Sequence, residues 1–135
     1  MPNQSLIITI LLLLLLGFSS CKKESYNIEY TIENNSLRSL NIIFKKLDRP
    51  NPDSNLIASG QSLIFLIESG DNQTSDEFLN GLDSIPVSIL TITDTDQNHL
   101  AWDEQNLDHW HKQIFDGKKD TKATMTARIR ELDFE

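Results

Sequence analysis

The sequence predicts an all-β domain: an antiparallel, immunoglobulin-like β-sandwich with one short helix, after an N-terminal signal peptide. Two observations support this prediction. About six or seven strand-like runs, separated by polar turns, follow one another within about 110 residues. They are preceded by an apolar run that ends just before the single cysteine, Cys21. The total length of 135 residues allows one domain and hardly two.

The first strand is predicted over residues 26–33, where apolar and polar side chains alternate without interruption. A turn is expected at residues 34–36, because asparagine tolerates the left-handed region of backbone conformation. A second strand follows, in which Leu40, Ile42 and Phe44 occupy alternate positions and are expected on one face. The residues of the first strand expected to face the core are Tyr26, Ile28, Tyr30 and Ile32.

The rest of the chain continues the strand pattern. Two prolines predict a loop at residues 49–54. The strand over residues 61–68 contains an unbroken apolar run, 63–67, which is typical of a strand covered on both faces. The remaining expectations are a polar loop at 69–75, strands at 85–93, 99–102 and 121–132, and a turn at 94–98. In the last strand, Ala123, Met125, Ala127 and Ile129 are expected on one face.

One segment has helical spacing. Asp103 is a suitable residue to cap the start of this helix, and Gly117 is suitable for its end. Its apolar face, at positions i, i+3, i+4, i+7 and i+8, consists of Leu107, Trp110, His111, Ile114 and Phe115.

The apolar run over residues 6–18 has 13 residues, broken only by a threonine and a glycine. A membrane-spanning helix needs roughly 20 apolar residues, whereas the core of a signal peptide needs about 7–15. The next residues, Phe18, Ser19, Ser20 and Cys21, resemble the lipobox of a bacterial lipoprotein precursor. The resemblance implies cleavage before Cys21 and a diacylglycerol on its sulfur. Ordinary cleavage after Ser19, and an uncleaved anchor, remain alternatives.

This resemblance divides the chain into a signal peptide (1–20), a lipidated cysteine with a short tether (21–25) and a β-sandwich domain (26–135). The layout is similar to that of the small β-sandwich lipoproteins of Bacteroidota-type bacteria. The similarity implies attachment to the outer membrane through lipid on Cys21, with the domain facing the periplasm or the cell surface. It specifies no oligomeric state.

Composition excludes several function classes. With 12 basic and 20 acidic residues, the net charge of −8 argues against a nucleic-acid partner. One cysteine excludes an internal disulfide and a cysteine-rich zinc module. No nucleotide-binding motif or nucleophile elbow is present, so we expect no cofactor and no enzyme activity. The leading hypothesis is a binding module for a protein or glycan, and the alternatives are a periplasmic inhibitor or immunity-type protein and a small hydrolase.

The stretch Asp94-x-Asp96-x-Asn98 matches the opening of a calcium-binding loop. The sixth position is His99 rather than glycine, and the twelfth is Gln105 rather than glutamate, which excludes an EF-hand. The two hypotheses are a looser calcium site and a polar turn. The wider stretch 94–108 has five acidic residues and no lysine or arginine, which would suit a basic partner.

Three further candidates remain. His99, His109 and His111 are considered as zinc ligands, although in a helix His109 and His111 would point about 200° apart. Trp102 and Trp110 are expected either to pack in the core or to form an exposed aromatic platform. The sequence Asp83-Ser84-Ile85 resembles the short O-glycosylation site of exported Bacteroidota proteins, which implies a glycan on Ser84.

Overall fold

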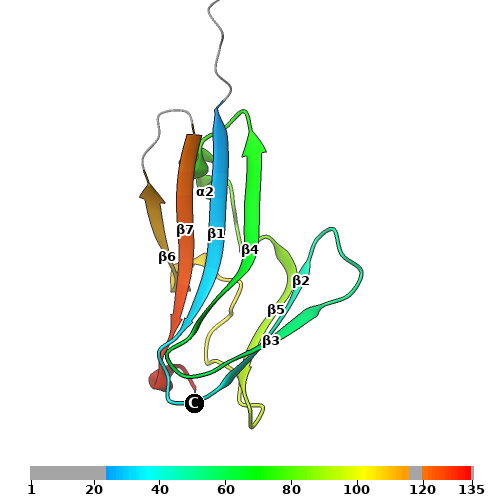
Figure 1. The fold of residues 1–135 in the computed structure, drawn as a ribbon, viewed down its shortest axis with the longest axis vertical. Helices are drawn as coiled ribbons and strands as arrows, with labels where there is room; N and C mark the ends of the chain where they lie inside the picture. Colours follow the sequence, from blue (N-terminus) through cyan, green and yellow to red (C-terminus); the bar gives the residue numbers. More distant parts are fainter. Residues whose placement is uncertain (1–23, 116–119, 135) are drawn as a thin grey trace, which may run out of the picture.

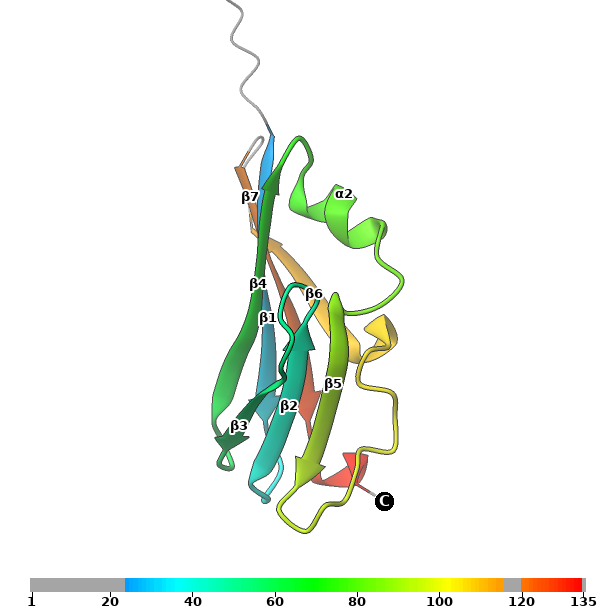
Figure 2. The same cartoon turned by 90° about the vertical axis from the view of Figure 1, so that its right-hand side faces the viewer.

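The computed structural model describes residues 24–115 and 120–134, which form a two-layered β-sandwich (Figures 1 and 2). The elements in chain order are β1 (Ser25–Asn34), β2 (Leu40–Lys46), β3 (Asp53–Ile57), β4 (Ser62–Asp71), α2 (Ser75–Asn80), β5 (Val87–Asp94), the 3₁₀ helix η1 (Leu107–His109), β6 (Trp110–Phe115), β7 (Asp120–Ile129) and the 3₁₀ helix η2 (Glu131–Asp133).

Two sheets face each other across the core. The four-stranded sheet has the order β4-β1-β7-β6, and the three-stranded sheet has the order β3-β2-β5. This arrangement confirms the predicted all-β sandwich. The core consists of inward-facing side chains from both sheets, including Ile28, Tyr30 and Ile32 of β1 and Leu40 and Ile42 of β2, all fully buried.

One pair of strands departs from the antiparallel expectation. β1 and β7 run parallel over their whole length, from Ser25 opposite Asp120 to Asn34 opposite Ile129. A parallel pair needs a long connection, and here nearly the whole domain lies between the two strands. The pairing places the first strand inside a sheet, whereas in immunoglobulin constant domains the first strand lies at an edge.

The alternation predicted for the first and last strands is confirmed. In β7, Ala123, Met125, Ala127 and Ile129 are all buried, at most 4% exposed. The strand ends at Ile129, three residues before the predicted end, because the chain then turns into η2.

The apolar run of β4 is not covered on both faces as predicted. Ile64 and Ile67 are 51% and 55% exposed, whereas Phe65 and Leu66 are buried. The register explains this pattern, since Tyr30 pairs with Leu66 and Thr31 with Ile64, which leaves Phe65 as the extra residue of a β-bulge. The bulge turns two successive side chains into the core and leaves the outer face of the sheet open.

The predicted helix over residues 107–115 is wrong. After the single turn of η1, the chain forms the edge strand β6, whose Trp110 lies opposite Ala127 of β7. Trp110 faces the core, but His111, expected to be buried beside it, is exposed. Asp103 caps no helix, because its carboxylate accepts a hydrogen bond from the amide of Gln105 in a turn. Gly117 lies outside the described residues.

The α-helix forms instead at α2, directly after the predicted polar loop. Its N-cap is Thr74, whose hydroxyl accepts a hydrogen bond from the backbone amide of Glu77. The Glu77 side chain in turn accepts a hydrogen bond from the backbone amide of Thr74. This capping box is a recognisable sequence signal. α2 covers the inner face of the four-stranded sheet near the start of β1, where Phe78 stacks on Tyr26 with ring centroids 4.4 Å apart. No helix among the described residues is long and apolar enough to span a membrane.

Two short segments also differ from the expectation. Asp53–Ile57 forms the edge strand β3, beginning inside the predicted loop 49–54. The predicted strand 99–102 is reduced to a single bridge between Thr93 and His99, and the rest of it runs along β5 without further ladder pairing.

Candidate functional site at the distal end

Several connections meet at the end of the sandwich opposite Ser25 (Figure 1). We call this region the distal end and define it as residues 34–38, 58–61, 94–98 and 131–134. β1 leads to it from Ser25 through ten residues, which span about 30 Å at the usual rise of a strand. The distal end therefore brings together the end of β1, the end of β5 and the C-terminal turn.

Asn34 organises the connection between β1 and β2. Its side-chain oxygen accepts hydrogen bonds from the amide and the hydroxyl of Ser36, at 3.1 and 2.7 Å, and its amide nitrogen donates to the carbonyl of Arg38 at 2.8 Å. The predicted turn at 34–36 is present, but its physical basis differs. Asn34 does not have a positive φ angle, so the side chain, rather than left-handed backbone, makes the turn.

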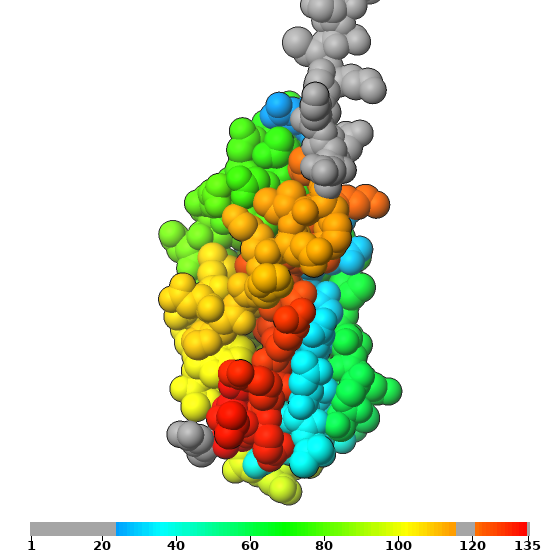
Figure 3. Space-filling model, turned by 90° about the vertical axis from the view of Figure 1, so that its left-hand side faces the viewer, coloured from blue at the N-terminus to red at the C-terminus, as the bar shows by residue number. Residues whose placement is uncertain are grey.

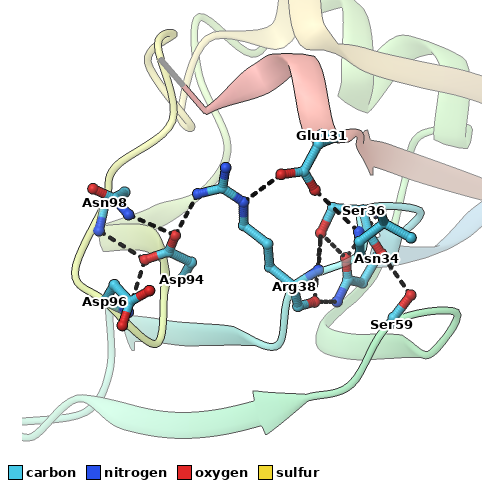
Figure 4. Close-up of polar contacts among 9 residues, drawn as sticks. Asn34, Ser36, Arg38, Ser59, Asp94, Asp96, Asn98 and Glu131 are labelled. Carbon is cyan, nitrogen blue, oxygen red and sulfur yellow. Dashed lines mark hydrogen bonds and ion pairs between the residues drawn. The ribbon is translucent and has the colours of Figure 1, made fainter.

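Arg38 joins three segments that are far apart in the sequence (Figure 4). Its Nη1 donates to Oδ2 of Asp94 and its Nε to Oε1 of Glu131, both at 2.6 Å. The guanidinium also lies over the ring of Phe134, 5.0 Å from the centroid. One side chain thus connects the β1–β2 connection, the end of β5 and the C-terminal turn.

Asp94 is only 1% exposed, and its carboxylate accepts several hydrogen bonds. Besides Arg38, it accepts from the amides of Asp96 and Asn98, at 2.9 and 2.8 Å, and from the side-chain nitrogen of Asn98 at 2.7 Å. The bond from the Asn98 side chain is the main cause that lowers the pKa of Asp94 to about 2, against the opposing effect of burial. The segment proposed as a calcium loop is therefore arranged as a polar turn around one carboxylate.

The other metal candidates are not brought together. Among the residues that the structure describes, no three His, Cys, Asp or Glu side chains lie close enough to hold a metal ion. His99 and His109 are exposed in the segment after β5, and His111 is exposed on the outer face of β6. Of the five acidic residues in 94–108, Asp94 is buried and Glu104 is half-buried. The carboxylate of Glu104 accepts a hydrogen bond from the backbone amide of Ile92.

The two tryptophans have separate roles. Trp110 is buried against Phe65 and Tyr30, and its Nε1 donates to the carbonyl of Glu104 at 3.0 Å. Trp102 is half-buried and stacks on His109, with ring centroids 4.4 Å apart. One tryptophan is thus a core residue, and the pair does not form a shared platform.

Two leucines protrude from the distal end. Leu37 and Leu132 are 87% and 79% exposed, the highest values among the large apolar side chains described. The amide of Leu37 donates to Oε2 of Glu131 at 3.1 Å, so the residue preceding Leu132 is tied to the backbone of Leu37. Figure 3 shows the C-terminal turn, in red, on the surface of this end. The polar network therefore holds two apolar side chains outward on neighbouring segments.

The remaining predicted residues lie elsewhere. Ser84 is exposed in the connection between α2 and β5, and the next residue, Ile85, is buried in the core. Cys21 lies outside the described residues. Sequence reasoning did not identify Arg38 or Glu131, because 93 residues separate them and no local pattern links them.

Comparison with protein-family models, with curated proteins and with solved structures finds no match for this chain.

The Asp94 carboxylate predicts a loss of stability in acid. Its folded-state pKa, about 2, lies below its ordinary value of 3.8, so its charged form contributes stability that is present above pH 3.8 and is lost as the pH falls towards 2. We expect the urea midpoint to fall steeply between pH 4 and pH 2. An Asn98→Ala variant should show a shallower fall, because it lacks the main cause of the lowered pKa. Equal slopes for the two proteins would contradict this role of Asn98.

Proposed function

We propose that this protein is a membrane-anchored bacterial lipoprotein whose β-sandwich is a non-enzymatic binding module at the outer membrane. Support for the anchor comes from the sequence, in which an apolar run of signal-peptide length ends in Phe18, Ser19, Ser20 and Cys21. A mature lipoprotein with two or more acyl chains would be held firmly, since two chains give stable anchoring and one does not.

The placement of the strands supports a specific orientation. Three residues lie between Cys21 and Ser25, where β1 begins, so the four steps from one to the other reach at most about 14 Å. A lipid on Cys21 would hold the start of β1 near the membrane. Because β1 crosses the length of the sandwich, the distal end would point away from the bilayer, by about 30 Å for the strand alone.

Leu37 and Leu132 carry the proposal of binding. Exposed leucines are common singly, but here two lie on neighbouring segments whose backbone is tied by the same carboxylate, Glu131. The charged groups Arg38 and Asp94 are engaged with each other, and the two leucines are the most exposed large apolar side chains at this end. An apolar contact surface on a prearranged frame loses little conformational entropy on binding, which favours association with a protein.

The anchor and the contact surface are tested in one experiment on intact cells. The wild-type protein should incorporate a fatty-acid label, and Cys21→Ala should abolish it. A photo-crosslinking amino acid at position 37 or 132 should give an adduct of discrete mass. The same amino acid at position 64, which is exposed on the outer face of β4, is the control and should give none.

Each arm can fail separately. Label retained in Cys21→Ala would contradict the lipid anchor. Two results would contradict the distal end as the contact surface. One is crosslinking from position 64 that is as strong as that from positions 37 and 132, and the other is no crosslinking from any of the three positions.

A further inference from the structure

One edge of the four-stranded sheet is open beside a groove. β4 is the outermost strand of that sheet, and β1 is its ladder partner. The groove has a volume of about 450 Å³ and is lined by residues 66–69 of β4 and by residues 46–49, at the turn from β2 to β3. Figure 1 shows the β2–β3 hairpin spreading away from β4 at this place. The groove therefore runs alongside the edge of a strand.

The ladder between β1 and β4 determines which backbone groups point towards this groove. The amide of Asn72 donates to the carbonyl of Glu24 at 2.7 Å, so these two opposed residues form a hydrogen-bonded pair. Hydrogen-bonded and non-bonded pairs alternate along an antiparallel ladder. The register has no shift between this pair and the bulge at Phe65. Counting back along β4, Ile67 and Ser69 therefore belong to non-bonded pairs.

The backbone amides and carbonyls of Ile67 and Ser69 are thus available to another strand. In a non-bonded pair these groups point away from the partner strand, here away from β1 and towards the groove. Within the described ranges, no backbone hydrogen bond outside the β-ladder involves either residue. An antiparallel segment could exchange two hydrogen bonds with each of them, because alternate residues of a strand point their backbone groups to the same side.

The side chains of the groove favour an uncharged ligand with an apolar group. Ile67 is 55% exposed, and Leu47 on the opposite wall is 73% exposed. The charged side chains that line the groove comprise two of each sign, Lys46, Arg49, Asp48 and Glu68. A ligand of either charge would meet repulsion as well as attraction, whereas an apolar side chain gains from covering Ile67.

A second copy of this chain is a poorer fit to the edge than a peptide. Two β4 edges would pair antiparallel about a two-fold axis, which sets the copies end to end. The start of β1 in one copy would then lie beside the distal end of the other. Two copies anchored through Cys21 in one membrane cannot adopt this arrangement. This exclusion rests on the proposed lipid anchor, but the geometry of the groove does not.

We propose that this groove binds an extended peptide segment of a partner protein, which adds to β4 as an antiparallel fifth strand of the sheet. The peptide backbone exchanges hydrogen bonds with Ile67 and Ser69, and an apolar side chain of the peptide lies beside Ile67. In strand addition of this kind, main-chain hydrogen bonds give the affinity and alternate side chains give the specificity. The site lies on the side of the sandwich, apart from the contact surface proposed at the distal end.

The test uses the full protein, purified in a nonionic detergent and followed by NMR chemical shifts. The probe is the capped peptide acetyl-Pro-Val-Thr-Val-Pro-amide. Its two valines can face β4, and its prolines, which lack an N–H, disfavour the register shifted by one residue. We expect saturable binding, with shift changes at residues 46–49 and 66–69 and little dependence on salt, because the peptide has no charge.

Methylation of the peptide nitrogens tests the backbone contacts. N-methylation of both valines should weaken binding about tenfold or more, because it removes the two N–H donors that face β4. N-methylation of the central threonine is the matched control. Its N–H points away from β4, so the affinity should stay close to that of the unmodified peptide.

Two variants of the protein test the side-chain contact. Ile67→Ala should weaken binding about fivefold, since it removes the apolar surface that the peptide covers. Ile64→Ala is the matched control, because Ile64 is similarly exposed on β4 but does not line the groove. Both side chains are at least half exposed, so both variants should fold.

Four results would overturn the proposal. The first two are the absence of saturable binding and equal weakening by the two methylation patterns. The third is equal weakening by Ile67→Ala and Ile64→Ala. The fourth is a set of shift changes at residues 110–115 of β6 as large as those at 66–69, which would show that the peptide adds to any open edge. Association of the protein with itself through residues 66–69, in the absence of peptide, would assign the edge to a second copy instead.

Discussion

Replacing Arg38 with alanine is expected to lower the melting temperature by roughly 10 °C, since it removes the charged partner of a carboxylate, Asp94, that is buried. Arg38 donates to Asp94 and Glu131, both at 2.6 Å, and the Asp94 side chain is only 2% exposed. Without Arg38, the Asp94 carboxylate would stay buried with one charged partner missing. Thermal unfolding followed by circular dichroism measures the effect.

The control for this prediction is Arg128→Ala. Arg128 also pairs with a glutamate, Glu33, at 2.9 Å, but its side chain is 59% exposed on the outer face of the sheet. Exposed ion pairs contribute little to stability, so this variant should unfold close to the wild-type temperature. Similar shifts for Arg38→Ala and Arg128→Ala would show that the distal network is only a surface feature.

Replacing Phe65 with alanine is expected to lower the free energy of unfolding by about 3–5 kcal/mol, the usual cost of truncating a buried aromatic side chain. Phe65 is 4% exposed and lies between three other rings, with centroid distances of 5.3 Å to Phe44, 5.9 Å to Trp110 and 6.4 Å to Tyr30. Such a loss is a large part of the total stability of a small domain. Urea denaturation at pH 7 measures it.

Ile64→Ala is the matched control, because Ile64 precedes Phe65 in the same strand but is 51% exposed. Its substitution should change the free energy of unfolding by about 0.5 kcal/mol or less. If the two variants lose similar amounts, the β-bulge does not place Phe65 in the core, and the unbroken apolar run 63–67 would be buried as a regular strand.

Part of the distal end could be predicted from local sequence. The sequence predicts both the Asn-Asn-Ser turn after β1 and the Asp-x-Asp-x-Asn turn after β5, because asparagine and aspartate are frequent in turns. In the structure, the side chains of Asn34 and Asp94 make these turns by bonding to backbone amides a few residues away. Their joining by Arg38 was not predicted. Arg38 and Asp94 are 56 residues apart, and only the pairing of β2 with β5, which sets Leu40 opposite Asp94, brings their side chains within 2.6 Å.

The segment 107–115 shows why local patterns can mislead. Trp110 and Ile114 are four residues apart, which fits one face of a helix, but they also have the same parity and fit one face of a strand. The tertiary structure decided between the two, because the edge of β7 accepts six paired residues from β6. The hydrogen bonds of that ladder, and the burial of Trp110, outweigh a helical preference of a few tenths of a kcal/mol per residue.

The sequence by itself determined the all-β class and the alternation of β1 and β7, since both depend on composition or on the periodicity of neighbouring residues. The signal-like run before the domain stays a prediction from the sequence. Only the tertiary structure decided the parallel pairing of β1 with β7, the bulge at Phe65, the strand β6 and the ion pair of Arg38 with Asp94. These features depend on which distant strand lies alongside. The choice of partner is set by the burial of the whole core, and no local spacing in the sequence records it.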